Sequence, residues 1–216
     1  MTVKRVYRIG IYTLGMLVLA LGLTLNSQTG LGLSPVLSVA YGISEIWGIK
    51  FGDATFIQYI LFIAGEFIIR GKKRQWYDLL QLPFSLVFSR LLNVYAGLLP
   101  YNAAAHGLTM NLLVLVLSVI FTGIGVAMMV NMRLIPNPAD GFVQAMSDRW
   151  GRDQGFMKNV FDVACVVATV LLTLVFGGQI MGVGIGTIVA MIGVGRVIAL
   201  VNGLFQDKMC RAAGMI

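Results

Sequence analysis

The sequence predicts an all-α polytopic membrane protein, with six transmembrane helices and two re-entrant half-helices arranged as a 3+3 inverted repeat. Three observations predict this fold: a strongly apolar composition, six apolar runs of membrane-spanning length, and two halves that match each other. Of the 216 residues, 58% are hydrophobic and only 12% are charged, whereas about a quarter of the residues in soluble proteins are charged. Lipid therefore has to solvate much of the chain.

Six apolar runs are long enough to cross a hydrocarbon layer of about 30 Å as helices. They cover residues 9–27, 54–70, 79–98, 108–130, 157–177 and 183–205. No small-residue cleavage signal follows the first run, so we expect a retained span and not a signal peptide. Two shorter stretches, 35–47 and 138–150, each begin at a proline, which suits the first turn of a helix. We expect both to enter the membrane without crossing it.

Basic residues decide the topology. If the two short stretches do not cross, one side of the membrane receives Lys4, Arg5, Arg8, Arg70, Lys72, Lys73, Arg74, Arg133, Arg149, Arg152, Lys158, Lys208 and Arg211. Only Lys50 falls on the other side. Because basic loops stay in the cytoplasm, we predict a multi-pass protein of the bacterial cytoplasmic (inner) membrane with both termini cytoplasmic. The net charge of +7 then reflects topology and anionic lipid headgroups, not nucleic acid.

The two halves match each other at an offset of 103 positions. The matched pairs are Gly22 and Gly125, Ser34 and Asn137, Pro35 and Pro138, Ser44 and Ser147, Trp47 and Trp150, Gly48 and Gly151, and Gly52 and Gly155. We predict a single membrane domain over 1–216, with one repeat at about 1–100 and the other at about 105–216. Each repeat has an odd number of spans, so the second enters the membrane inverted, as in many secondary transporters.

The stretch from Gly30 to Pro35, followed by Gly42-Ile-Ser44, Trp47-Gly48 and Gly52, resembles the YczE/YyaS/YitT group of bacterial membrane proteins. Gly186-Thr187 matches a later Gly-Thr element of that group. The resemblance covers most of the chain and implies a membrane fold, but no particular substrate. Where the group has Trp-Asp after a proline, this chain has Val36-Leu37 in the first half and Ala139-Asp140 in the second, so a shared ligand is not implied.

Two arginines fall in the middle of apolar spans. Arg90 lies in the third span and Arg196 in the sixth. A charge at mid-bilayer costs about 3 kcal/mol or more, and arginine cannot lose its proton to avoid that cost. We therefore expect either a binding site for an anionic group, or a structural ion pair with Asp140 or Asp162.

The half-helix starts, Ser34-Pro35 and Asn137-Pro138, favour the same kind of site. Free N–H groups and positive dipole ends at the midplane are suited to bind an anion. Asp140 is either an ordinary helix-start residue or a ligand for a coupled cation. Asp162 is either a proton or cation carrier or a structural partner of Arg196.

Three further polar residues lie within the spans. Gln58 and Gln81 are candidate ligand contacts. Glu66 lies four residues before Arg70, a spacing that predicts an i,i+4 ion pair.

The residue types do not favour a metal site, a disulfide framework, an enzyme or a water channel. His106 is the only histidine and is expected in a loop, which excludes a histidine-based metal site; Cys165 and Cys210 suggest no disulfide or metal cage. No nucleophile–base pair or nucleotide loop is apparent, so we expect neither an enzyme nor a cofactor. Asn137-Pro138-Ala139 matches the NPA triplet of aquaporins, but there the half-helix follows two spans in each repeat and here it follows one.

These patterns lead us to expect a small secondary transporter for an anionic or zwitterionic organic solute, bound at the midplane between the inverted repeats. The alternative is a non-transporting membrane scaffold or regulator of another membrane or biosynthetic system, in which the arginines are sealed in ion pairs. The expected partners are the lipid bilayer and the solute. Glycine-rich spans also permit a homodimer.

Overall fold

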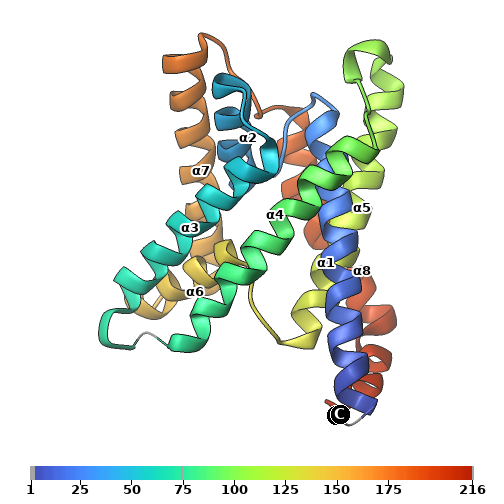
Figure 1. Cartoon of the computed structure of the whole chain (residues 1–216), viewed down its shortest axis with the longest axis vertical. Helices are drawn as coiled ribbons and strands as arrows, with labels where there is room; N and C mark the ends of the chain where they lie inside the picture. Colours follow the sequence, from blue (N-terminus) through green and yellow to red (C-terminus); the bar gives the residue numbers. More distant parts are fainter. Residues whose placement is uncertain (1–2, 74, 216) are drawn as a thin grey trace. The chain divides into compact units, whose positions relative to one another are not determined.

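The computed structural model describes residues 3–73 and 75–215 (Figure 1). Arg74, part of the predicted cytoplasmic basic cluster, lies outside the described residues. In the described part of the chain all regular secondary structure is helical. The α-helices are α1 (Val3–Gln28), α2 (Pro35–Trp47), α3 (Phe51–Arg70), α4 (Gln81–Leu98), α5 (Leu108–Met132), α6 (Pro138–Trp150), α7 (Gln154–Gly177) and α8 (Ile185–Ala212); the 3₁₀ helices are η1 (Gly71–Lys73), η2 (Trp76–Leu80) and η3 (Ala103–Ala105).

Within residues 3–73 and 75–215, six helical segments are long and apolar enough to cross a membrane. They are α1, α3, α5, α7, α8 and the segment from η2 through η3, which contains α4. They coincide with the six predicted spans, although α1 begins earlier and α8 extends further than expected. The chain is therefore a multi-pass membrane protein by the length and composition of its helices. The two predicted short helices, α2 and α6, have 13 residues each, which corresponds to about 20 Å at 1.5 Å per residue.

The two short helices begin at a proline in the first turn, as predicted. At α6, the Asn137 side chain accepts a hydrogen bond from the Ala139 N–H at 3.0 Å. At α2, Ser34 occupies the equivalent place, but its side chain makes no capping hydrogen bond. Ser34 therefore occupies the N-cap position of α2 without capping the helix through its side chain.

The repeated Ser-acid-x-Trp-Gly pattern forms the same helix end twice. Gly48 and Gly151 adopt left-handed conformations, with φ of 65° and 62°. At each end the serine hydroxyl donates to the backbone carbonyl five residues later, from Ser44 at 2.7 Å and from Ser147 at 2.6 Å. Glycine adopts the left-handed conformation without the steric strain that a side chain would cause. The motif therefore ends both helices just after the tryptophan.

The chain divides into two compact units. Unit 1 contains Met1–Gly32, Val94–Leu134 and Gly184–Ile216, and unit 2 contains Leu33–Asn93 and Ile135–Val183. Unit 1 thus holds α1, α5 and α8, and unit 2 holds α2, α3, α6, α7 and α4 up to Asn93. Each unit draws helices from both halves of the sequence.

In unit 1, α1 and α5 cross in antiparallel directions through glycines that leave no room for a side chain. A Cβ atom at Gly22 would lie 2.6 Å from the Thr122 nitrogen and 2.8 Å from the Ser118 oxygen. A Cβ atom at Gly125 would lie 2.5 Å from the nitrogen of residue 19 and 2.7 Å from the oxygen of residue 15. Positions 15, 19 and 22 of α1 correspond to 118, 122 and 125 of α5 at the offset of 103, so equivalent positions form both sides of the crossing.

In unit 2, each short helix packs beside the C-terminal half of a long helix from the other half of the sequence (Figure 1). On α2, the Ser38 hydroxyl lies 2.7 Å from that of Thr169 on α7. On α6, the positions equivalent by the offset of 103 also meet, because Gly141 faces the Glu66 carboxylate of α3. A shared core holds these helices together and includes Val36, Ala139, Val143, Met146, Met157, Phe161 and Cys165.

Candidate functional site

Two consecutive residues of α3 connect the starts of both short helices. The Gln58 Nε2 donates a hydrogen bond to the Val36 carbonyl of α2 at 2.6 Å. The next residue, Tyr59, accepts a hydrogen bond at its hydroxyl from Asn137 Nδ2, at the start of α6, at 3.1 Å. Val36 and Ala139, the second residues of the two helices, belong to one buried cluster. The two positive helix ends therefore lie near the same segment of unit 2.

Polar groups without a partner lie next to this junction. The Gln58 Oε1 is buried and has no hydrogen-bond partner among the described residues. Asp140, in the first turn of α6, is half-buried and forms no hydrogen bond or ion pair in the described part of the chain. It lies within electrostatic range of Lys158, Asp162 and Tyr59. The junction therefore offers an acceptor oxygen and a carboxylate that a bound group could engage.

Asp162 forms an ion pair with Lys158, one turn earlier on α7. The predicted alternative, a partnership of Asp162 with Arg196, stays a prediction, because Arg196 belongs to the other unit. An i,i+4 partner on the same helix reaches the carboxylate without any help from tertiary structure. Asp162 lies next to Phe161 of α7, which belongs to the same buried cluster as Val36 and Ala139.

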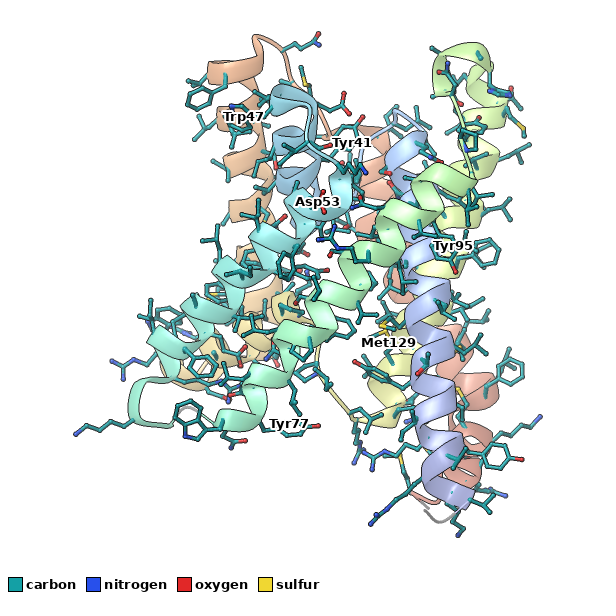
Figure 2. The ribbon with its side chains drawn as sticks, viewed as in Figure 1. Tyr41, Trp47, Asp53, Tyr77, Tyr95 and Met129 are labelled. Carbon is teal, nitrogen blue, oxygen red and sulfur yellow. The ribbon has the colours of Figure 1, made fainter. Side chains whose placement is uncertain are left out.

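Arg90 pairs with Asp53, with 2.8 Å between Nη1 and Oδ1. Asp53 lies in the first turn of α3 (Figure 2). Asn93 adds a hydrogen bond to the same Asp53 oxygen at 3.0 Å. The predicted alternative that Arg90 pairs with Asp140 or Asp162 is therefore wrong: the middle of α4 meets the start of α3, where Asp53 lies. The Arg90 side chain is 60% exposed and that of Asp53 is 38% exposed, so further guanidinium donors stay accessible.

Arg196 belongs to unit 1, whereas every other predicted site residue belongs to unit 2. Its side chain is exposed and makes no hydrogen bond or ion pair with any residue that the structure describes. Arg196 therefore lies on the exposed surface of α8.

Gln81 lies in a buried polar network of unit 2. Its Nε2 donates to Glu66 Oε2 at 2.9 Å, and neither side chain is exposed. Arg70 Nε lies 2.9 Å from Glu66 Oε1 and 3.7 Å from Asp78 Oδ2. The predicted pair between Glu66 and Arg70 is confirmed. Asp78 of η2 and Gly141 of α6 were not predicted to join this network. Asp78 reaches it through Arg70, and Gly141 through the packing of α6 on α3.

Metal-ligating residues are scattered. Among the described residues, no group of three or more histidine, cysteine, aspartate or glutamate side chains is placed to hold a metal ion. His106 lies in the predicted loop, with Nδ1 2.8 Å from the Asn102 carbonyl and its ring stacked on Tyr101. Cys165 and Cys210 are free thiols.

Comparisons with known proteins assign the chain to a family. The family described as "Family of unknown function (DUF6198)" matches residues 6–203. The chain belongs to this family. It is also 25% identical to "Uncharacterized protein YyaS" of Bacillus subtilis (strain 168) over 181 residues, which cover 83% of this chain and 85% of the relative. No solved structure matches.

The DUF6198 match and the similarity to YyaS confirm the resemblance drawn from the glycine and proline pattern. The matched range, 6–203, includes both short helices and the junction on α3.

Proposed function

We propose that this protein is a small secondary transporter for an anionic or zwitterionic organic solute, in the cytoplasmic membrane of a bacterium. One observation carries the proposal: adjacent residues of α3, Gln58 and Tyr59, bind the starts of both short helices. Convergent helix starts present positive dipole ends, and transporters built from inverted repeats place their substrate at such broken helices.

The inverted repeat itself is part of the proposal. The antiparallel crossing of α1 and α5 at positions 103 apart supports it, as do the matching ends of α2 and α6. Helices of about 20 Å are short for a hydrocarbon layer of about 30 Å, which supports re-entrant half-helices. In this arrangement both termini are cytoplasmic, and access alternates as one repeat rocks against the other.

The junction suits a solute that carries a negative group and can also carry a positive one. The helix starts at Ser34-Pro35 and Asn137-Pro138 bind the carboxylate or similar anion, and Arg90, in the same unit, supplies a full positive charge. A positive group on the solute pairs with Asp140, or with the free Gln58 Oε1 through a hydrogen bond. Asp140 and Asp162 are the candidates for binding a coupled cation or proton. Gln81 is held by Glu66 and acts through that network.

A second candidate function is a non-transporting scaffold or regulator. The observation that favours it is charge compensation, since Arg90 is paired with Asp53 and Asp162 with Lys158. In this case the charges of the spans serve stability alone, and no solute occupies the junction.

Thermal unfolding of the purified protein in detergent separates the two functions. A panel of carboxylates, sulfonates, phosphates, amino acids and inorganic anions is tested on the wild type and on the double variant Arg90→Gln/Asp53→Asn, which removes both charges together. Arg8→Gln is the control, because Arg8 binds the Met132 and Arg133 carbonyls in unit 1. A ligand at 100 times its Kd stabilises the folded state by about 2.7 kcal/mol.

The transporter proposal expects one ligand class to raise the Tm of the wild type and of Arg8→Gln, but not that of the double variant. The same solute is then expected to enter proteoliposomes that contain the wild type. If no class stabilises the wild type and the double variant unfolds at the wild-type temperature, the charges have no ligand and the transporter proposal fails.

A further inference from the structure

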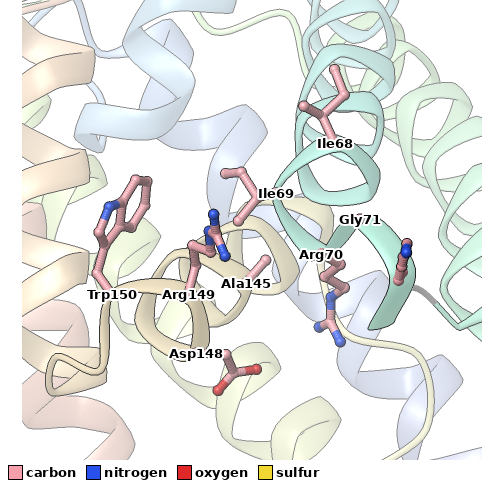
Figure 3. Close-up of a pocket in the computed structure, with 9 residues that line it drawn as sticks. Ile68, Ile69, Arg70, Gly71, Ala145, Asp148, Arg149 and Trp150 are labelled. Atoms are coloured by element: carbon pink, nitrogen blue, oxygen red, sulfur yellow. The ribbon is translucent and has the colours of Figure 1, made fainter.

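The C-terminal ends of α3 and α6 enclose a cavity of about 510 Å³ in unit 2 (Figure 3). Arg149 extends from the last turn of α6 toward Ile69 on α3. Arg70 and Lys72 line the opposite side, at and just beyond the end of α3. The cavity lies away from the junction of Gln58 and Tyr59, near the opposite end of α3.

Two of the three cations in this cavity have no partner. Arg70 is held by Glu66 and Asp78. Lys72 and Arg149 form no hydrogen bond or ion pair within the described residues. Asp148 is the one acidic residue of the lining that the structure describes, and it accepts a hydrogen bond from Gln144 at 2.8 Å. The cavity therefore has net positive charge.

Two apolar residues of the lining are exposed. Ile68 is 80% exposed and Trp150 is 58% exposed. Tryptophan at the end of a membrane helix is typical of the interface between headgroups and hydrocarbon. A ligand that fits this lining has an anionic head and an apolar body.

We propose that this cavity binds the phosphate headgroup of an anionic phospholipid in the cytoplasmic leaflet. Arg149 and Lys72 contact the phosphate, and the acyl chains run along Ile68 and Trp150. Basic pockets between membrane helices on the cytoplasmic side bind such headgroups. The inference rests on the proposed topology for the choice of leaflet, but not on the transported solute.

Favourable placement of cations at helix C-terminal ends explains only part of the lining of this cavity. A cation in the last turn favours the negative end of the helix dipole, which accounts for Arg149 and Arg70. It does not account for Lys72, which follows the end of α3, or for exposed apolar walls beside the cations. Both features are expected of a lipid site.

The first test measures lipid binding to the full-length protein by native mass spectrometry and thermal unfolding. Phosphatidylglycerol is compared with phosphatidylcholine, and inorganic phosphate and glycerol phosphate serve as soluble probes. Lys72→Gln/Arg149→Gln removes the two free cations of the cavity. Lys208→Gln/Arg211→Gln is the matched control, because it removes the same charge from the end of α8.

We expect the wild type and the control to retain phosphatidylglycerol over phosphatidylcholine, and the cavity variant to lose at least about five-fold of that preference. Equal losses in the cavity and control variants would mean attraction by net charge alone and would overturn the proposal. So would a Tm rise with inorganic phosphate as large as with the lipid. Neither outcome bears on solute transport, which the anion panel tests separately.

A second measurement locates the acyl chains. A Trp47→Phe/Trp76→Phe variant leaves Trp150 as the only tryptophan. Brominated phosphatidylglycerol is expected to quench its fluorescence at lower lipid fractions than brominated phosphatidylcholine. Addition of Lys72→Gln/Arg149→Gln is expected to abolish the difference, and a difference that persists would show that the lipid does not use these cations.

Discussion

At the scale of single residues, the buried polar network of Glu66 and Gln81 leaves room only for a glycine at position 141. A Cβ atom there would lie 2.7 Å from Glu66 Oε2 and 3.0 Å from Gln81 Nε2, and both side chains are fully buried. We expect Gly141→Ala to lower the free energy of unfolding by about 1–3 kcal/mol, as overpacking of a core does. Gly97→Ala is the control, because a Cβ at this helical position meets nothing within 4 Å. Equal Tm values for the two variants would contradict the described packing.

The ion pair between Arg90 and Asp53 makes a second prediction. Because both side chains are partly exposed, we expect a coupling energy of about 1 kcal/mol or less. A double-mutant cycle from Arg90→Gln, Asp53→Asn and their combination measures it. The exchanged pair Arg90→Asp/Asp53→Arg is expected to unfold near the wild-type temperature. Strictly additive effects of the two single variants would show that the residues are not coupled.

Among the helices, α2 and α6 owe their matching ends to one glycine each. Gly48 and Gly151 have positive φ, and a Cβ at either position meets no neighbour within 4 Å. The cost of alanine there is therefore purely conformational, about 1 kcal/mol. We expect Gly48→Ala and Gly151→Ala to lower the stability equally, and the asparagine variants to lower it less, because asparagine tolerates this conformation. The Tm values of these variants test the prediction. A large decrease for only one of the two glycines would contradict the equivalence of the α2 and α6 ends.

For the whole molecule, the proposed re-entrant helices determine the side of every loop. In a background with Cys165 and Cys210 replaced by serine, single cysteines are placed at Lys72, His106, Arg152 and Gln179. We expect a membrane-impermeant thiol reagent added to intact cells to label positions 106 and 179, and to label 72 and 152 only after the cells are opened. If α2 crossed the membrane, labelling of 72 and 106 would be exchanged.

Much of the fold could be predicted from local patterns. Apolar runs located the six long helices, and Pro35, Pro138 and the glycines after Trp47 and Trp150 marked the bounds of the short ones. These features depend on neighbours within a few positions, because lipid requires each span to satisfy its own backbone hydrogen bonds. The matching ends of α2 and α6 were predictable for the same reason, because their serine and glycine turns are local.

The partners of the charged residues were decided by tertiary structure alone. Arg90 pairs with Asp53 because the middle of α4 meets the start of α3, and Glu66 faces Gly141 because α6 packs on α3. The cavity beside Arg149 exists for the same reason. Residue spacing specifies which positions share a helix face, but it does not specify which face of another helix they meet. Contacts between distant segments therefore had to come from the packed chain.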